Sequence, residues 1–461
     1  MTQRTSDEVD GSLAEVPFRD AVIVWLKIGL LSFGGPAGQI AMMHRVLVEE
    51  KRWIGEARYL HALNYCMLLP GPEAQQLATY VGWLLHRTLG GLVAGILFIL
   101  PGALVMLMLS IIYVLYSDLP LINALFFGVK AAVLAIVAEA VLRIGRRALG
   151  NQAMYAIAAL AFIAIFFFSV PFPFIVFTAA LIGFLGARVD PDRFVIIVGH
   201  GGSDAVAVAD ASLESGRLDH SRPTLARAVY VAAICLSLWF VPLILALIVM
   251  GGEDVFTHIG WFFSKLSVVT FGGAYAVLAY MAQQAVEAYG WLAPGEMLDG
   301  LGLAETTPGP LIMVVQYVGY LAAFRNPGVF DPLTAGLIGA ALATWVTFVP
   351  CFLWIFLGAP YIEKLRNNMN LSAALSGITA AVVGVILNLA VWFGMHVVFK
   401  EVGTLEIGAF VLPLPVLAST DFGALGLSLF AIWLAFGKNL GLFATLGLTA
   451  AAGILLNFLP W

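Results

Sequence analysis

Long apolar stretches separated by short polar turns follow one another along the whole chain. They lie at about 18–44, 59–86, 89–117, 120–143, 151–169, 171–187, 225–251, 256–284, 296–324, 333–358, 371–399, 421–437 and 440–460. Each is close to or above the roughly 20 residues with which a helix crosses the hydrocarbon core of a bilayer. The pattern therefore predicts an all-α polytopic membrane protein with about 13 transmembrane segments.

Polar stretches divide this series into units. Residues 1–20 form a polar N-terminal tail, and 188–224 is the one long polar connector. We therefore expect a first six-segment repeat at 21–187, a linking transmembrane helix at 225–251 and a second repeat at 252–461.

An internal duplication supports this division. The motif Phe-Gly-Gly at 33–35 returns at 271–273, a shift of 238 residues, and Pro-Gly-Pro at 70–72 returns at 308–310 with the same shift. After an insertion near 325–335 the shift becomes 249, which places Thr379 opposite Lys130. Six segments plus the linking one make an odd number, so the second repeat enters from the opposite face. This is the inverted-repeat topology of many secondary transporters.

The placement of Lys and Arg predicts the orientation of the chain. With the N-terminus in the cytoplasm, most of the basic residues fall on the inner side, as the positive-inside rule requires. The connection at 45–58, which carries four basic residues, breaks this rule if every segment spans. Re-entrant hairpins at the Phe-Gly-Gly and Pro-Gly-Pro segments would move it inside. Both versions remain open at this point.

Composition excludes several classes of protein. Hydrophobic residues make up 61% of the chain and charged residues 11%, which leaves no soluble catalytic domain. The sequence has no G-x-x-x-x-G-K-[ST] loop, no G-x-S-x-G and no H-E-x-x-H, and its three cysteines are not paired in a metal or redox motif. We expect neither an enzyme nor an ATP-driven pump, and no cofactor, metal or nucleic-acid partner.

The Gly/Pro motifs are the candidate substrate site. Glycine and proline interrupt the helical hydrogen-bond ladder, and free backbone groups in a membrane are tolerated where they are buried in protein or face a watery cavity. A helix that starts after such a break points its N–H groups and positive dipole end at it, which suits an anion. Close packing of helices is the alternative explanation of these motifs. The predicted binding residues are Phe33, Gly34, Gly35, Pro70, Gly71, Pro72, Phe271, Gly272, Gly273, Pro308, Gly309 and Pro310.

Charged and polar residues within the apolar segments add further candidates. Lys27 and Lys265 each lie six residues before a Phe-Gly-Gly motif, and Lys130 lies deeper in its segment. Each ammonium can attract an anion, although Lys27 and Lys265 can also reach the interface as snorkelling lysines. Neutral groups that can reach the same space are Gln75, Gln76, Thr306, Thr307 and Gln316.

Three carboxylates are candidates for proton coupling. Glu73 follows the first Pro-Gly-Pro, Glu305 precedes the second, and Glu139 lies within an apolar segment. An ionised carboxylate repels a nearby anion, so protonation and anion binding favour each other. For Glu73, capping of its own helix is the alternative role.

Several runs resemble the chromate ion transporter family in its long-chain, two-unit form. They are FGGPAGQIAMMHRVLVEEKRWI at 33–54, LLPGPEAQQLATYVGW at 68–83, LPGALVMLMLS at 100–110, TFGGAYAVLAYM at 270–281 and ETTPGPLIMVVQYVGYLAAF at 305–324. The second repeat departs from the pattern by carrying Ala274 and Ala276 after its Phe-Gly-Gly.

The resemblance implies a function that the residues alone do not. It implies a multi-pass protein of the plasma (inner) membrane that exports chromate by secondary active transport, driven by the proton motive force, and confers chromate resistance. Sulfate or another oxyanion is the alternative cargo, since sulfate is also a tetrahedral dianion, and an anion channel is the alternative mode of transport. A homodimer is compatible with the sequence but is not indicated by it.

Overall fold

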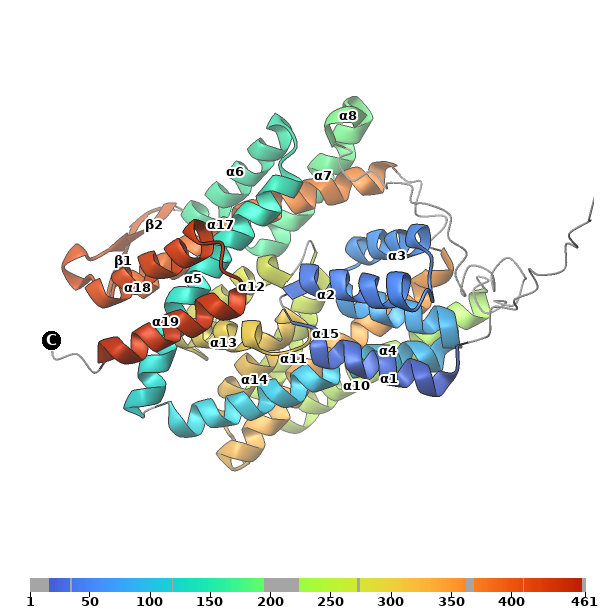
Figure 1. Ribbon diagram of the computed structural model, residues 1–461, viewed down its shortest axis with the longest axis horizontal. Helices are drawn as coiled ribbons and strands as arrows, with labels where there is room; N and C mark the ends of the chain where they lie inside the picture. The colour runs from blue at the N-terminus through green and yellow to red at the C-terminus, as the bar shows by residue number, and fades with distance from the viewer. Residues whose placement is uncertain are drawn as a thin grey trace, which may run out of the picture.

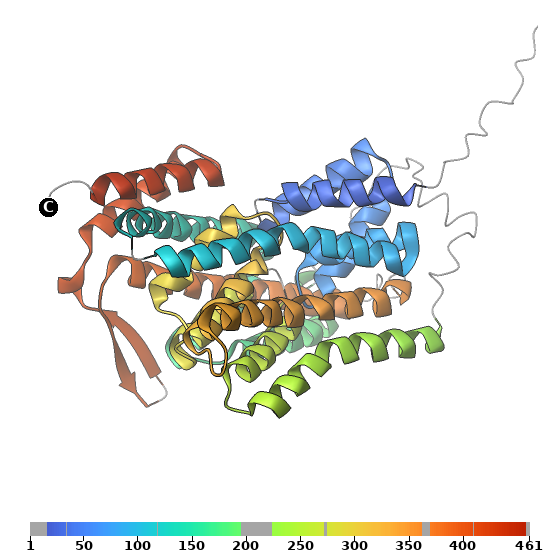
Figure 2. The same ribbon diagram turned by 90° about the horizontal axis from the view of Figure 1, so that it is seen from below.

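The structure, a computed structural model, describes residues 16–33, 35–117, 119–194, 224–271, 274–361, 369–408 and 410–457. Its helices form one elongated body and mostly run close to the long axis (Figure 1, Figure 2). The start of α1 lies at one end of this axis, and a two-stranded hairpin lies at the other (Figure 1). Most of the predicted N-terminal tail and connector lies outside the described residues.

The elements follow the predicted series of segments. The first repeat consists of α1 (Phe18–Leu31), α2 (Gly35–His44), the π-helix η1 (Arg45–Glu50), α3 (Glu56–Leu68), α4 (Glu73–Tyr116), α5 (Pro120–Ala148), α6 (Gln152–Phe168) and α7 (Phe172–Val189). Next come α8 (Pro191–Phe194) and the linking helix α10 (Leu225–Met250). The second repeat consists of α11 (Val255–Val269), α12 (Ala274–Ala282), η3 (Gln283–Ala288), α13 (Pro294–Thr306), η4 (Leu311–Met313), α14 (Val314–Arg325), α15 (Pro332–Gly358), η5 (Ala359–Tyr361), α17 (Met369–Val398), β1 (Val402–Ile407), β2 (Phe410–Pro415), η6 (Leu417–Ser419), α18 (Phe422–Ile432), η7 (Trp433–Gly437) and α19 (Leu442–Asn457).

This composition confirms the all-α polytopic membrane class. Among the described residues, six helices are long and apolar enough to cross a bilayer, and five further apolar helices are shorter. The antiparallel hairpin of β1 and β2 is an addition that the apolar pattern did not predict. It lies between α17 and α18, where the second repeat is longer than the first.

The duplication is repeated element by element. The ends of α3 and α13 are 238 residues apart, as are the ends of η1 and η3. The first residue of α17 follows that of α5 by 249 residues. The starts of α18 and α19 each follow those of α6 and α7 by 270, because the β-hairpin is inserted before them.

The two repeats are wrapped around one another with reciprocal contacts. Helix α7 of the first repeat packs on α17 of the second, and the equivalent α19 packs on α5. Gly128 lies against the carbonyl of Thr449, and its counterpart Gly377 lies against that of Ala179. Exchanged contacts of this kind indicate a pseudo-two-fold relation between the repeats, as an inverted repeat requires.

The segments that carry the Gly/Pro motifs are helical hairpins. Helices α1 and α3 have 14 and 13 residues, about 20 Å each, which is shorter than the hydrocarbon core of roughly 30 Å. His44, at the end of α2, meets Glu56 at the start of α3, with 2.6 Å between Nε2 and Oε2. Arg325, at the end of α14, pairs with Glu296 near the start of α13. In each case the chain returns to the end from which it entered, so the structure fits the re-entrant version of the prediction.

Helix α4 contains a reversal that its continuous assignment conceals. His86 and Arg87 leave the helical conformation, and Arg87 has a φ of 56°. On either side of them Gly82 and Gly90 lie against each other's carbonyl groups, so the two arms pack at backbone distance. The first arm closes the α3 hairpin, and the second is the long helix that runs on to Tyr116.

The tips of these hairpins are joined by main-chain hydrogen bonds between the repeats. Gly71 N–H donates to the carbonyl of Thr270 at 2.8 Å, and Gly309 N–H donates to that of Ser32, also at 2.8 Å. Gly71 and Gly309 have φ values of +116° and +89°, which L side chains rarely adopt. The breaks of one repeat are thus completed by those of the other.

The first prediction concerns Gly71. Gly71→Ala should lower the free energy of unfolding by about 2 kcal/mol or more, because the φ is strained for alanine and the added Cβ meets Cys351 Sγ at 2.8 Å. Thermal unfolding in detergent measures the change. Gly426→Ala in α18 is the matched control, since no atom lies within 4 Å of its added Cβ. Equal stability of the two variants would contradict this account of the break.

The second prediction concerns the hairpins. Arg52→Cys and Arg87→Cys should react with an impermeant thiol reagent from the same face of the membrane, because a hairpin brings both exposed positions to one side. Lys400→Cys should react from the other face. If the segments between them spanned the bilayer, positions 52 and 87 would react from opposite faces, and the hairpin assignment would be wrong.

Candidate functional site

The predicted breaks of the two repeats meet within the body of the protein. Besides the reciprocal bonds of Gly71 and Gly309, the Gln39 amide donates to the carbonyl of Gly309 at 2.5 Å. Phe33 packs edge-on against Phe443, with ring centroids 5.7 Å apart. The prolines of the second break, Pro308 and Pro310, are buried, as is Pro72, while Pro70 is half-buried. Of the predicted residues, Gly34, Gly272 and Gly273 lie outside the described residues.

Three glutamine side chains lie buried just beyond these breaks. The Gln75 amide donates to Thr79 Oγ1 at 3.1 Å, and the Gln76 amide donates to the carbonyl of Pro70 at 2.7 Å. Within the described part of the chain, the Oε1 atoms of Gln75, Gln76 and Gln316 have no hydrogen-bond partner. Buried polar atoms without partners are costly, and a bound polar ligand or water satisfies them. An amide can also turn over and present its N–H groups.

Two of the predicted carboxylates are buried close to the breaks. Glu73 is the first residue of α4 and is 8% exposed, and Glu305 in α13 is 5% exposed. Tyr275 O–H donates to Glu305 Oε1 at 2.7 Å. Burying carboxylates in a membrane protein is expensive, so their positions mark a functional site by default.

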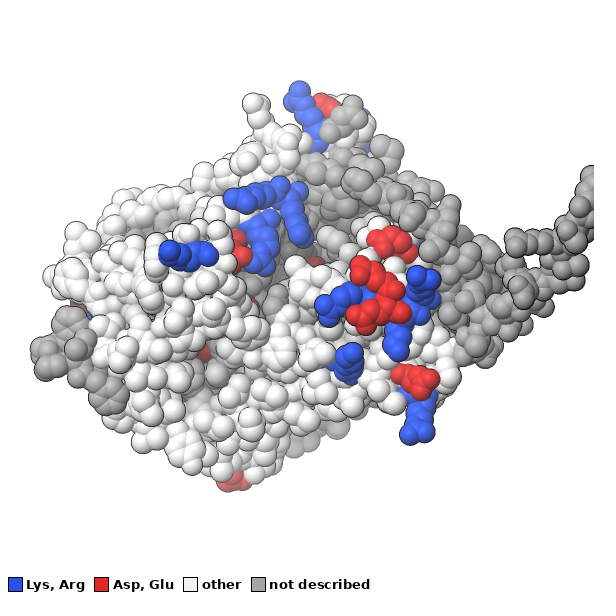
Figure 3. Space-filling view, viewed as in Figure 1, with Lys and Arg blue, Asp and Glu red and all other residues white. Residues whose placement is uncertain are grey.

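The C-terminal end of α5 is basic. Arg143, Arg146 and Arg147 are exposed there, and basic side chains gather beside a hollow in this face of the molecule (Figure 3). Arg143 pairs with Glu139 one turn earlier and interacts electrostatically with Glu305. A cluster of arginines at the rim attracts anions toward the hollow.

Other predicted residues lie away from the breaks or are tied to their own helix. Lys27 and Lys265 are on the exposed faces of α1 and α11. Thr306 is exposed and donates to the carbonyl of Leu303 at 2.8 Å, whereas Thr307 is buried and donates to that of Ala304 at 3.0 Å. Their roles as anion contacts stay predictions.

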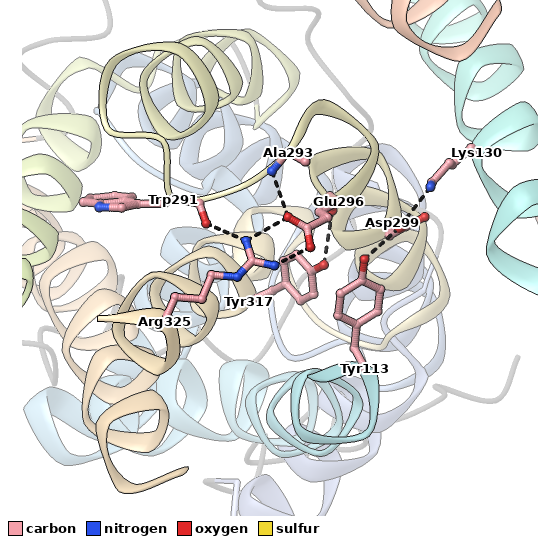
Figure 4. Close-up of polar contacts among 8 residues, drawn as sticks. All are labelled: Tyr113, Lys130, Trp291, Ala293, Glu296, Asp299, Tyr317 and Arg325. Atoms are coloured by element: carbon pink, nitrogen blue, oxygen red, sulfur yellow. Dashed lines mark hydrogen bonds and ion pairs between the residues drawn. The ribbon is translucent and has the colours of Figure 1, made fainter. Parts of the chain in front are cut away.

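Lys130 belongs to a charged network between the repeats (Figure 4). Its Nζ lies 3.3 Å from Asp299 Oδ2 of α13, and Tyr113 O–H of α4 donates to the same oxygen at 2.9 Å. Nearer the start of α13, Glu296 is paired with Arg325 of α14. The ion pair of α5 with α13 therefore joins the first repeat to a hairpin of the second.

Asp299, Glu296, Arg325, Tyr113 and Tyr275 were not among the predicted residues. The sequence did contain a signal for Asp299, an acidic residue within the apolar segment 296–324, close to its start. Its pairing with Lys130 could not be foreseen, because the two residues are far apart in the sequence. Among the described residues, no group of three or more His, Cys, Asp or Glu side chains is placed to hold a metal ion.

Comparison with known proteins gives the family. The chain matches the chromate transporter family over residues 19–184 and 257–455. A chromate transport protein of Pseudomonas aeruginosa is 34% identical over 390 residues, which are 83% of this chain and 83% of the relative. One of Cupriavidus metallidurans is 31% identical over 383 residues, 82% of this chain and 83% of the relative.

Other relatives extend the comparison. A probable chromate transport protein of Synechococcus elongatus is 28% identical over 376 residues, 80% of this chain and 83% of the relative. No solved structure matches the chain. The family match covers both repeats, and with it the breaks and the buried charges between them, so this chain belongs to the chromate transporter family.

Proposed function

We propose that the protein is a secondary active carrier that exports chromate across the plasma membrane, is driven by the proton motive force and thereby confers chromate resistance. The observation that carries the proposal is the meeting of the two breaks, where the amides of Gln75, Gln76 and Gln316 are buried with unused hydrogen-bonding capacity. Two of the relatives are named chromate transport proteins, which supports chromate over another oxyanion as the cargo.

The anion would bind at the helix ends that face the breaks. Pro72 precedes α4, and Pro310 precedes η4 and α14, so each helix starts with free N–H groups and the positive end of its dipole. Opposed helix N-termini from two inverted repeats are a recurrent way to hold an anion near the middle of a membrane. The buried amides would complete its hydrogen bonds.

The proton would bind at the carboxylates beside the same breaks, Glu73 and Glu305, with Glu139 nearer the rim. The counterparts of Glu73 and Glu305 at the 238-residue shift are Leu311 and Met67. Each repeat therefore contributes one carboxylate, but on different sides of its break. Neutralising such a carboxylate removes its repulsion of a bound dianion, which couples the two ligands.

The proposed orientation follows from the charges. With the N-terminus, the connector and the arginines of α5 in the cytoplasm, the basic residues obey the positive-inside rule once the hairpins are re-entrant. Chromate from the cytoplasm would meet Arg143, Arg146 and Arg147 first. The units bounded at 21–187, 225–251 and 252–461 would form one transport body, and dimerisation is not required by it.

Transport in vesicles tests the proposal. Proteoliposomes with the purified protein should release trapped chromate faster when a pH gradient is imposed than when it is dissipated, with sulfate added as competitor. No chromate movement in either protein orientation would overturn the assignment. Chromate flux that is indifferent to the pH gradient would instead indicate a channel, and stronger inhibition by sulfate than by chromate itself would indicate a sulfate carrier.

The third prediction concerns Glu73. Glu73→Gln should lower proton-coupled chromate transport by about tenfold or more without lowering the amount of protein in the membrane, because the amide keeps the size of the side chain but cannot exchange a proton. Flux in proteoliposomes at matched protein density measures this. Glu401→Gln, at an exposed position before the β-hairpin, is the control. Wild-type flux in Glu73→Gln would leave Glu73 with a capping role alone.

A further inference from the structure

The pair of Lys130 and Asp299 is not explained by the anion site at the breaks. It lies within α5 and α13, on the side of the breaks that faces the start of α13, and it is largely withdrawn from solvent, with side-chain exposures of 25% and 4%. Removing two charges from water is costly even when they pair, and well-packed apolar residues often serve stability as well. A purely structural role is therefore a weak explanation.

The two carboxylates of this network differ in how fully they are used (Figure 4). Both oxygens of Glu296 bind Arg325, and Oε2 also accepts from the N–H of Ala293 at 2.8 Å. Asp299 receives Lys130 and Tyr113 on Oδ2 alone. In the described part of the chain its Oδ1 is buried and has no hydrogen-bond partner. Asp299 therefore has one oxygen that can take up a proton without displacing either contact.

The duplicated scaffold carries this pair on one side only. At the shifts of the two repeats, the counterpart of Lys130 is Thr379 and that of Asp299 is His61. A threonine cannot form the ion pair, so the symmetry of the fold does not demand the pair. The pair was placed on one arm of a scaffold whose other contacts are exchanged reciprocally.

We propose that Lys130 and Asp299 form a proton-linked switch for the oxyanion, in which Asp299 competes with the anion for the Lys130 ammonium. When Asp299 is ionised, Lys130 is neutralised by it and holds no anion. When Oδ1 takes up a proton from water, the carboxyl group becomes neutral and Lys130 keeps its charge, free to bind the dianion. This inference rests on the proposed function and adds a second, proton-dependent station to it.

The other ionisable groups around Asp299 are consistent with this assignment. Tyr113 of α4 and Tyr317 of α14 contribute hydroxyl groups, and their rings meet edge to face at 5.4 Å. Glu296 and Arg325 neutralise each other. Lys130 is therefore the cation whose charge depends on the state of Asp299.

Equilibrium binding to the full-length protein in detergent or nanodiscs tests the switch. The probes are sulfate, which stays a dianion from mildly acidic to mildly alkaline pH, and chromate, compared between variants at equal pH so that its own protonation cancels. In the wild type the Kd should rise with pH, by at most about tenfold per pH unit for one linked proton.

Asp299→Asn should abolish this pH dependence and, at alkaline pH, bind the anion more tightly than the wild type, on the order of tenfold. A gain in affinity is not what structural damage produces, and so it separates the switch from a structural ion pair. Lys130→Gln should weaken binding at every pH, whereas Lys130→Arg should keep the pH-linked binding. Asp331→Asn, which removes an exposed carboxylate at the start of α15, is the control and should keep the wild-type slope.

The outcomes are distinguishable. If the wild type binds chromate and Asp299→Asn keeps its pH slope, the switch is overturned while the proposed function stands. Weaker binding by Asp299→Asn, together with a lower unfolding temperature, would assign the pair to structure and would also overturn the switch. If the wild type binds neither oxyanion at any pH, the proposed function and the switch both fail.

Discussion

The structure depends on one constraint, that every backbone N–H and C=O group inside a bilayer needs a partner within the protein. The Gly/Pro motifs break four helices and free such groups in the interior. Gly71 and Gly309 give their N–H groups to Thr270 and Ser32, across the boundary between the repeats. Neither repeat could keep its own breaks at this depth without the other. A requirement of the solvent is thus met by a contact that also holds the two halves together.

The same contact places polar groups where a transported anion can reach them. Because the breaks are tips of hairpins, the helices that leave them start inside the protein and aim their N-terminal N–H groups inward. Gln75 and Gln76 follow within the first turn of α4 and are buried with it. The residues that cost most in a lipid-facing helix are therefore gathered at the one place where the backbone is already irregular.

The repeats are alike in backbone and unlike in charge. Reciprocal pairs such as Gly128 with Thr449 and Gly377 with Ala179 preserve the pseudo-two-fold relation, since close backbone approach leaves no room for a side chain. The charged residues ignore it: Glu73, Glu305, Lys130 and Asp299 each face a different kind of residue in the other repeat. A symmetric scaffold with asymmetric charges has two ends that are chemically distinct, as transport in one direction requires.

The sequence by itself determined the membrane class, the duplication and the bounds of most elements, because apolar length and repeated Gly/Pro motifs are local and survive without tertiary contacts. It also identified Lys130, Glu73 and Glu305 as charges in the wrong solvent. Only the tertiary structure decided that the broken segments turn back, since both versions fit the same hydropathy. It also paired Lys130 with Asp299 and left Lys27 and Lys265 on exposed faces. Long-range pairing and the face that a helix presents depend on packing between segments far apart in the chain, and no local pattern encodes them.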